Sequence, residues 1–374
     1  MSALFFEISP MFENQWTGIP IVTSELVRCA VADPDASWTY LYQNIIVDRA
    51  VVEEMLARRR GGDYLAHLER QLWAQATLDH DDAAKGACIF PNVKPLRNVF
   101  RSESLILHDL STLLTPEFHN LDTILYHTNR IRPDIATSDF IFCVSDSTMQ
   151  DLNTYFPESR GKSGVIPMGI RMDPCILSEL ILSRSEVQFE PYICVLGTIE
   201  PRKNGAMVFD LLTENRELLS RYKIVFVGRD GWNDAKGALL GRLREAGLDT
   251  DRVVFAGFVS EDAKLKLLAN CSFCIYPSFF EGYGIPVAEA AVLGKYVVCS
   301  NSSSLPEVAP EMSFFFNPLD VASLSEAVYL AEKASRLTRL NDLSYLDINA
   351  KLKQRDWGRA YTMVRDRMLL GAAA

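Results

Sequence analysis

Short apolar runs alternate with helical patterns through the second half of the chain, and this rhythm limits the possible folds more than any other feature. Each run has four or five residues, ends in turn residues and leads into a stretch of helical periodicity. Strands and helices that alternate at this length predict a parallel sheet with helices on both faces, and therefore an α/β fold. The runs lie at 192–196, 223–227, 253–256, 273–276, 296–299 and 313–316.

The first half contains similar apolar runs with less regular spacing. The rhythm is lost between 171 and 190, apart from one short helical stretch. A chain of 374 residues is also too long for one typical domain and suits two. We therefore predict a first domain at 1–172, a linker at 173–190, a second domain at 191–350 and a C-terminal helical segment at 351–374, whose tail from Gly371 frays. The first-half runs lie at 3–6, 38–42, 88–90, 105–107, 140–144 and 164–169.

Composition excludes several classes of function. The net charge of −10 argues against nucleic acid as a partner, since such binding requires a basic surface. No apolar run approaches the length of a membrane span, and the first residues do not form a signal peptide. The eight cysteines lie mostly in apolar runs and are interpreted as buried thiols in a reducing cytoplasm. Cys271 and Cys274 have no second pair at zinc spacing, so no metal site is predicted there.

The stretch 271–300 carries the strongest chemical signal. A strand leads into a turn with glycines on both sides of Tyr283, then into a helix opened by Pro286, and then into a second strand. The start of such a helix attracts anions. Glu281 and Glu289 flank this start with seven residues between them. We expect Glu289 in the first helical turn, where it is either a ligand-binding carboxylate or a surface residue that the helix dipole favours.

A second segment with features of an anion-binding site is the turn after the first strand of the second half. This turn reads GTIEPRKN from Gly197. Arg202 and Lys203 stand immediately before a helix, so that the cations and the helix start would together attract a diphosphate. The next strand ends at Gly228 and Arg229. No G-x-G-x-x-G fingerprint occurs, which argues against a nicotinamide dehydrogenase.

Three other segments contain charged or polar residues that indicate a function less strongly. His108 and Asp109 follow a strand directly, which predicts polar side chains at the carboxyl edge of a sheet, where open α/β sheets bind ligands. The basic cluster at 58–60 lies in a helix predicted over 51–76, and is either a solvated helix end or a contact with an anionic membrane surface. The acidic residues 79–82 predict an exposed loop without a metal.

EGYGIPVAEA at 281–290 and GTIEPRKN at 197–204 resemble motifs of the retaining GT-B glycosyltransferases of family GT4, which includes bacterial mannosyl- and glucosyltransferases of polysaccharide assembly. The resemblance implies two Rossmann-like domains whose parallel sheets face across a cleft, and a last helix that crosses back to the first domain with Trp357 as its anchor. One departure is Thr198, where some members carry an additional Arg that contacts phosphate.

The resemblance also implies roles for single residues. Glu281 would hold hydroxyls of the donor sugar and Glu289 the ribose, while Arg202, Lys203 and the backbone N–H groups of Gly284 and Ile285 would neutralise the diphosphate. His108 would face the donor sugar. The remaining donor-binding residues are Gly197, Gly228, Arg229, Tyr283 and, beside the nucleotide base, Phe258 and Val259; on the acceptor side, Thr17, Gly18 and Asp109 complete the set.

The resemblance implies transfer of a hexose from a nucleotide diphosphate sugar to a hydroxyl group, with retention of the anomeric configuration and without a metal or cofactor. GDP-mannose is the first expectation for the donor and a UDP-hexose the second. The expected acceptor is a saccharide or lipid-linked saccharide, in the cytoplasm, with peripheral contact at the inner face of the membrane. A glycosidase that uses the same carboxylates and a non-catalytic nucleotide-sugar-binding protein are the alternatives.

Overall fold

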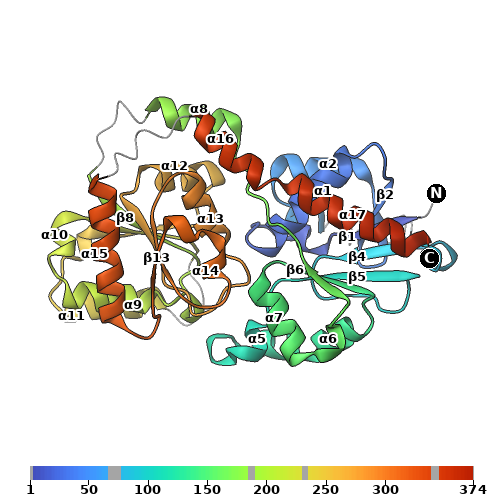
Figure 1. Cartoon of the computed structure of the whole chain (residues 1–374), viewed down its shortest axis with the longest axis horizontal. Helices are drawn as coiled ribbons and strands as arrows, with labels where there is room; N and C mark the ends of the chain where they lie inside the picture. Colours follow the sequence, from blue (N-terminus) through green and yellow to red (C-terminus); the bar gives the residue numbers. More distant parts are fainter. Residues whose placement is uncertain (1–2, 66–76, 184–189, 230–234, 338–344, 374) are drawn as a thin grey trace. The chain divides into compact units, whose positions relative to one another are not determined.

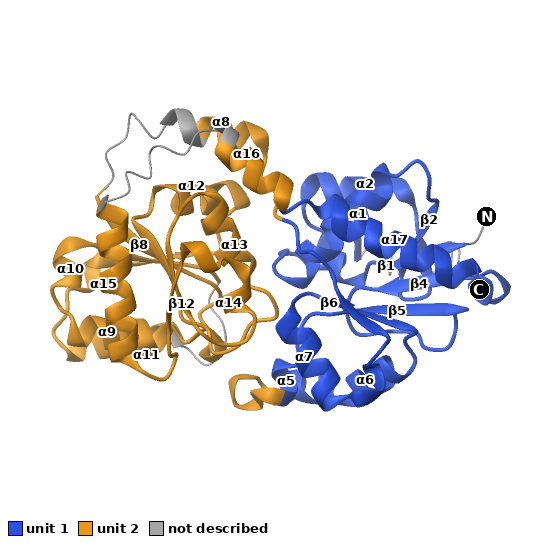
Figure 2. Ribbon diagram, viewed as in Figure 1, with its two compact units in different colours: residues 1–113, 121–169, 355–374 blue, residues 114–120, 170–354 orange. Residues whose placement is uncertain are grey.

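A computed structural model describes residues 3–65, 77–183, 190–229, 235–337 and 345–373. The chain divides into two compact units (Figure 2). The first contains residues 1–113, 121–169 and 355–374, and the second contains residues 114–120 and 170–354. Each unit is an α/β structure with its own sheet. The domain boundaries given above remain predictions.

The sheet of the first unit has seven strands in the order β3-β2-β1-β4-β5-β6-β7. Figure 1 labels β1, β2, β4, β5 and β6 of this sheet. All neighbouring pairs are parallel except β2 and β3, which are antiparallel. The sequence analysis missed β3, a three-residue edge strand. The strands are β1 (Leu4–Glu7), β2 (Trp38–Tyr42), β3 (Ile45–Val47), β4 (Ala87–Phe90), β5 (Ser102–Leu107), β6 (Phe140–Cys143) and β7 (Ser163–Val165).

The helices of the first unit correct three expectations. The residues predicted as an acidic loop form the short helix α4, because Asp79 caps it by accepting hydrogen bonds from the backbone N–H groups of Asp81 and Asp82. Helix α2 ends at Arg58, since Arg59 has a left-handed backbone (φ +55°), and 66–76 of the predicted helix lie outside the described residues. The helices are η1 (Ser9–Phe12), α1 (Ile19–Ala32), α2 (Arg49–Arg58), α4 (His80–Ala83), α5 (Ser111–Leu114), α6 (Leu121–Ala136), α7 (Asp146–Tyr155), η3 (Pro157–Ser159) and α17 (Trp357–Ala373).

The third correction concerns α17, which packs on α1, β4 and β5 within the first unit. The predicted fraying from Gly371 is wrong, because the helix continues to Ala373 and Ala372 is buried. At its other end the Trp357 ring lies against Gly169, where a Cβ would approach the indole Cγ to 2.4 Å.

The connection from β4 to β5 contains no helix, and a buried ion pair orders it instead. Lys94 and Glu103 are 1% and 2% exposed and form an ion pair. The Lys94 Nζ also donates to the Thr137 carbonyl at 3.1 Å, and Glu103 accepts a hydrogen bond from the Val99 N–H at 2.9 Å. Because Lys94 and Glu103 pair with each other, neither charge is buried without a counter-ion.

The sheet of the second unit has six strands in the order β10-β9-β8-β11-β12-β13, and all pairs are parallel. The six runs predicted from the sequence are these strands, with ends shifted by one residue at most. They are β8 (Tyr192–Leu196), β9 (Lys223–Val227), β10 (Val253–Gly257), β11 (Phe273–Tyr276), β12 (Val297–Ser300) and β13 (Ser313–Phe316).

Helices cover both faces of this sheet, so successive residues of a strand enter two different cores. In β8, Cys194 and Leu196 pack on one side with residues of α12, α13 and α16. Ile193 and Val195 pack on the other side with residues of α9, α11 and α15. A strand buried on both faces must be apolar throughout, which explains the continuous runs. The helices are α8 (Pro174–Ser183), η4 (Pro201–Lys203), α9 (Gly205–Glu214), α10 (Leu218–Arg221), α11 (Ala235–Glu245), η5 (Thr250–Arg252), α12 (Glu261–Asn270), α13 (Ile285–Val292), α14 (Leu305–Val308), η6 (Pro310–Met312), α15 (Val321–Leu337) and α16 (Tyr345–Gln354), with η2 (Pro116–Phe118) in the segment 114–120.

Candidate active site

The strand order of the second unit locates its ligand site. The chain passes from β8 outward to β9 and β10, and then returns to the other side of β8 with β11, so the direction of winding changes between β8 and β11. Open α/β sheets bind ligands at this switch point, outside the carboxyl ends of the strands. The two loops that leave these ends, 197–204 and 277–284, carry Arg202, Lys203 and Glu281 of the charged residues singled out in the sequence.

The loop after β11 needs glycine where it enters α13. Gly284 is the N-cap residue and has φ +103°. A Cβ at this position would lie 2.8 Å from the Leu305 Cδ2 atom, so neither the backbone conformation nor the space suits another residue. Pro286 follows in the first turn, as expected from the sequence.

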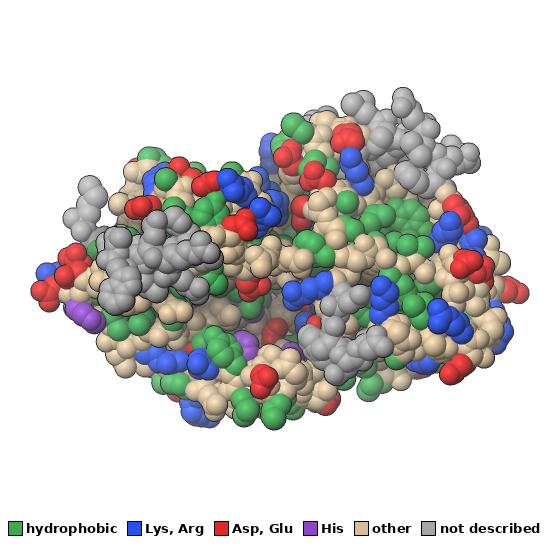
Figure 3. Space-filling view, turned by 180° about the vertical axis from the view of Figure 1, so that it is seen from behind, with side chains coloured by type: hydrophobic (Ala, Val, Ile, Leu, Met, Phe, Trp, Pro, Cys, Tyr) green, Lys and Arg blue, Asp and Glu red, His purple; other side chains and the backbone are tan. Residues whose placement is uncertain are grey.

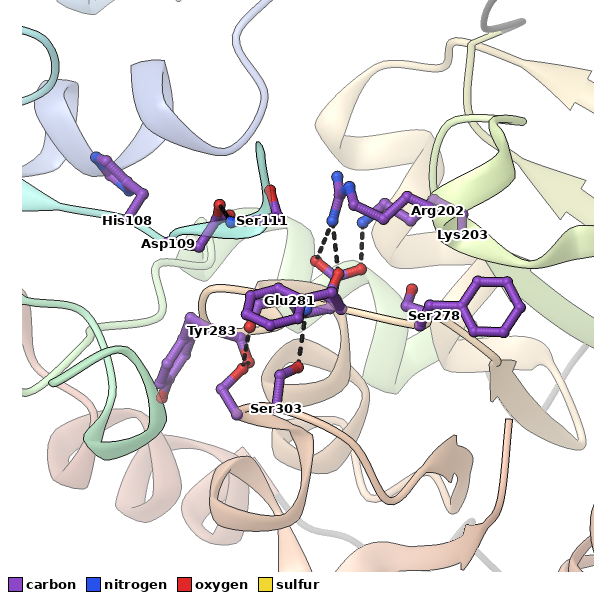
Figure 4. Close-up of polar contacts among 12 residues, drawn as sticks. His108, Asp109, Ser111, Arg202, Lys203, Ser278, Glu281, Tyr283 and Ser303 are labelled. Carbon is purple, nitrogen blue, oxygen red and sulfur yellow. Dashed lines mark hydrogen bonds and ion pairs between the residues drawn. The ribbon is translucent and has the colours of Figure 1, made fainter. Parts of the chain in front are cut away.

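A compact group of charges joins the two loops, which we call the Glu281 cluster: Glu200, Arg202, Lys203 and Glu281. Figure 4 labels the last three of these residues. The Lys203 Nζ donates to a Glu281 carboxylate oxygen at 2.6 Å and lies 3.0 Å from the Tyr276 hydroxyl. Arg202 donates to the Phe280 carbonyl at 2.7 Å and to Glu200 at 2.9 Å, and its Nη1 lies 3.4 Å from the second Glu281 oxygen. The structure therefore brings together three of the four predicted catalytic residues.

Ionisation in the cluster follows from these contacts. Burial alone would raise the pKa of Glu281, but the charges of Lys203 and Arg202 outweigh burial and lower that pKa to about 2. Burial lowers the pKa of Lys203, and the charge of Glu281 opposes this change. Glu281 is therefore a carboxylate at neutral pH, able to accept hydrogen bonds and unable to donate them.

Serines that follow β12 hold the backbone on both sides of Glu281. Ser303 accepts a hydrogen bond from the Glu281 N–H at 2.8 Å. The Ser304 hydroxyl lies 3.0 Å from the Glu281 carbonyl and donates to the Tyr283 carbonyl at 2.8 Å. Ser302 donates to the Phe279 carbonyl at 2.7 Å. The sequence analysis missed these residues, although a run of three serines after a neighbouring strand was a usable signal.

Glu289 lies apart from the Glu281 cluster. It is the fifth residue of α13 and so belongs to the second turn, which corrects the expected position in the first turn. It is only 4% exposed, and Lys264 of α12 donates to it at 2.8 Å. The alternative of a surface residue favoured by the dipole is therefore wrong. Lys264 was also missed; a lysine so close to a helix start opposes the dipole, and this conflict was a signal that acidic partners exist, here Glu289 and Glu261.

The glycines at the ends of β8 and β9 allow their loops to touch. Gly197 has φ +123°. A Cβ at Gly228 would lie 1.9 Å from the Gly197 carbonyl oxygen, so Gly228 is needed for this approach. The Arg229 carbonyl accepts a hydrogen bond from the Ile199 N–H at 3.0 Å. These contacts fix the loop that carries Arg202 and Lys203.

The two residues predicted beside the base differ in exposure. Phe258 follows β10 and is 47% exposed, so its ring is accessible to a ligand. Val259 packs against the core of the unit instead.

The other predicted residues lie in the first unit. There the winding changes between β1 and β4, and Thr17 and Gly18 follow β1, with Gly18 as the N-cap residue of α1 (φ +48°). His108 follows β5, and its Nε2 lies 2.8 Å from the Pro91 carbonyl. Burial lowers the pKa of His108, so the ring is neutral at pH 7 and donates its Nε2 proton to that carbonyl. Asp109 accepts a hydrogen bond from the Ser111 N–H at 2.9 Å.

Positive and negative side chains are interspersed on the face shown in Figure 3. Among the described residues, no group of three or more His, Cys, Asp or Glu side chains is arranged to hold a metal ion. Within the same residues, no helix is both long enough and apolar enough to cross a bilayer.

Comparison with solved structures defines the class of fold. Sucrose-phosphate synthase from Thermosynechococcus elongatus superposes with a TM-score of 0.68 over 100% of both chains, at 15% identity. HepE from Anabaena, solved in complex with UDP and glucose, gives a TM-score of 0.64 over 98% of this chain and 99% of its own, at 17% identity. The chain has the GT-B fold of glycosyltransferases.

Sequence comparison adds two similarities to glycosyltransferases. Residues 183–347, all in the second unit, match the model of the family described as glycosyl transferases group 1. The chain is also 29% identical over 310 residues to the O-antigen chain mannosyltransferase B of Escherichia coli, which covers 80% of this chain and 76% of that relative. The switch-point site with its Glu281 cluster thus lies inside the matched domain.

Proposed function

We propose that this protein is a retaining hexosyltransferase of family GT4 that transfers mannose from GDP-mannose to a hydroxyl group of a glycan or lipid-linked saccharide. The Glu281 cluster carries the proposal, because it places two cations and a carboxylate where the strand order predicts a ligand and where α13 begins. The similarity to a mannosyltransferase supports mannose as the sugar.

The chemistry requires stabilisation of a leaving group. As the bond between the anomeric carbon and the diphosphate oxygen breaks, negative charge grows on that oxygen. Arg202, Lys203 and the N–H groups of Gly284 and Ile285 neutralise this charge from fixed positions. Lys203 is held by Tyr276 at 3.0 Å, and Arg202 by the Phe280 carbonyl at 2.7 Å, so little reorganisation is needed during the reaction.

The carboxylates divide the rest of the donor between them. Glu281 accepts hydrogen bonds from hydroxyls of the hexose, and Glu289 accepts them from the ribose. The acceptor oxygen attacks the anomeric carbon on the face from which the diphosphate departs, and its proton passes to the leaving phosphate oxygen. This route needs no covalent intermediate, and the fixed cations take the place of a metal. The roles of His108, Asp109, Thr17 and Gly18 are part of the same proposal.

The place of action is also proposed from the relative. An O-antigen chain mannosyltransferase suggests an acceptor that grows in the cytoplasm at the membrane, and peripheral contact with the inner face is consistent with such an acceptor. The donor and the protein then share one compartment.

Transfer assays with the purified protein test the proposal. We expect turnover of GDP-mannose in the presence of EDTA, an α-linked product by NMR from the α-configured donor, and loss of transfer in Glu281→Ala. A β-linked product would rule out retention, and unchanged turnover in Glu281→Ala would remove Glu281 from the mechanism.

A UDP-hexose donor is the second candidate, because the similar HepE structure was solved with UDP and glucose. Thermal shift across GDP- and UDP-sugars distinguishes the two, since a ligand that binds the native state raises the melting temperature. A shift without transfer to any acceptor would indicate a non-catalytic nucleotide-sugar-binding protein. Release of free hexose by water without a nucleotide would instead indicate a glycosidase.

A further inference from the structure

In the structure, the carboxylate proposed for the hexose and the cations proposed for the diphosphate are bound to each other. Lys203 reaches one Glu281 oxygen at 2.6 Å, and Arg202 lies 3.4 Å from the other. The side chains of all three are less than one-fifth exposed. With Glu200 on Arg202, the cluster contains two positive and two negative charges and is formally neutral. A diphosphate that approaches this site therefore meets cations that already have an anion.

We propose that Glu281 is an internal competitor of the nucleoside diphosphate: it occupies Lys203 and Arg202 in the absence of a hexose, and it yields them when hexose hydroxyls donate hydrogen bonds to it. This inference rests on the proposed function, which assigns the diphosphate and the hexose to this site. It adds a role for Glu281 that the transfer reaction alone does not require.

Competition follows from the number of donors and from the sign of the charges. Lys203 has three N–H donors, of which one is directed to Glu281 and one to the Tyr276 hydroxyl. The third donor can bind a diphosphate oxygen, which then shares the same ammonium charge with Glu281. If Glu281 stays where it is, it repels the diphosphate at close range in a largely buried site, where charges interact more strongly than in water.

A bound hexose changes the competition between Glu281 and the diphosphate for the two cations. Its hydroxyls offer Glu281 new hydrogen-bond donors, so the carboxylate can leave Lys203 without becoming a buried charge that lacks a partner. A nucleoside diphosphate without the hexose offers no such donors. The site therefore ranks the intact donor above the diphosphate product, and the return of Glu281 to Lys203 after transfer weakens product binding and speeds its release.

Calorimetric titration of three proteins with inorganic pyrophosphate, GDP, UDP, GDP-mannose and UDP-glucose tests the proposal. The proteins are wild type, Glu281→Gln, which keeps the shape and removes the charge, and Glu289→Gln as the matched control. We expect Glu281→Gln to bind pyrophosphate and the preferred nucleoside diphosphate about tenfold more tightly, as for removal of one close like charge. Binding of the nucleotide sugar should not tighten.

The control has a clear expectation. Glu289 pairs with Lys264 at 2.8 Å and is not part of the Glu281 cluster, so Glu289→Gln should leave the affinity for pyrophosphate unchanged. Equal or weaker binding of pyrophosphate and nucleoside diphosphate by Glu281→Gln would overturn the proposal. Equal tightening in both variants would overturn it as well, because the effect would then reflect net charge alone.

Failure of the inference can be told from failure of the proposed function. If wild type binds nucleotide sugar and diphosphate but Glu281→Gln gains nothing, only the competitor role is lost. If no protein binds any of the five ligands, the donor site itself is refuted and the competitor role falls with it. Should Glu281→Gln not fold, wild type alone remains informative: it must bind the nucleotide sugar more tightly than the more highly charged nucleoside diphosphate, and the reverse order overturns the proposal.

Discussion

Glu7 offers a direct test of how burial controls ionisation in the first unit. It is the last residue of β1, beside the point where the winding of the sheet changes, and is only 2% exposed. Its carboxylate accepts hydrogen bonds from the backbone N–H groups of Ser9 at 3.1 Å and Gln43 at 3.3 Å. Burial outweighs these bonds and raises the pKa of Glu7 from 4.5 to about 7.

Glu7→Gln should therefore become more stable relative to wild type as the pH rises. Below pH 4.5 the carboxyl is protonated in both the folded and the unfolded protein, and the difference between the two proteins is constant. Between pH 4.5 and 7 the unfolded chain loses the proton while the folded chain keeps it, so wild type loses stability. Each pKa unit corresponds to about 1.4 kcal/mol, so the cumulative loss is about 3.5 kcal/mol and is complete slightly above pH 7.

Urea denaturation of both proteins at intervals from pH 4 to 8.5 measures the effect. The difference in unfolding free energy between variant and wild type is the informative quantity, because the other titrating groups contribute equally to both. Glu53→Gln is the matched control, because Glu53 is half exposed and its ion pair with Arg49 contributes little to stability. The difference in unfolding free energy between Glu53→Gln and wild type should vary little over this pH range. If the difference in unfolding free energy between Glu7→Gln and wild type stays constant from pH 4 to 8.5, burial does not raise the pKa of Glu7.

Three further predictions concern single contacts. Lys264→Met removes the cation that holds Glu289, and should weaken binding of the nucleotide donor about tenfold, or about 1.4 kcal/mol, with rescue by Lys264→Arg. Lys94→Met leaves Glu103 as a buried charge without its ion-pair partner, and should lower the unfolding free energy by about 3–5 kcal/mol in urea titrations. Gly284→Ala imposes a side chain on a backbone with φ +103°, and should cost about 1–3 kcal/mol of stability and reduce transfer.

Each of these three predictions has an outcome that would contradict it. Unchanged nucleotide affinity in the Lys264 variant would mean that α12 does not position Glu289. A loss below about 1 kcal/mol for Lys94→Met would mean that the ion pair contributes no more than a surface pair does. Full stability and full transfer in the Gly284 variant would mean that the turn into α13 tolerates a different backbone path.

The sequence predicted the strands of the second unit well because burial on both faces leaves a continuous apolar signature. It missed β3 because a three-residue antiparallel edge strand carries no comparable pattern. The two carboxylates, Glu281 and Glu289, were predicted from their positions around a helix start. The partners of these carboxylates were harder to predict from the sequence, because Lys264 lies 25 residues before Glu289 on another helix. Only the folded sheet brings these two side chains together.

The Glu281 cluster shows a similar limit. Arg202 and Lys203 were selected because cations precede a helix, but the sequence could not show that both would contact Glu281, which lies 79 residues after Arg202 and 78 after Lys203. That contact depends on β8 and β11 being neighbours, which is a property of strand order and not of any local pattern. Long-range electrostatics is thus the part of the site that local sequence signals do not contain.

The place of α17 affects how the protein is made. Its residues belong to the first unit, although about 200 residues separate them from the preceding part of that unit at Gly169. At typical synthesis rates of about 5–20 residues per second, roughly 10–40 seconds pass before α17 emerges. During that interval the surfaces of α1, β4 and β5 that α17 later covers are open to chaperones and proteases. The second unit is nearly continuous in sequence, so it can complete its core before the first unit does.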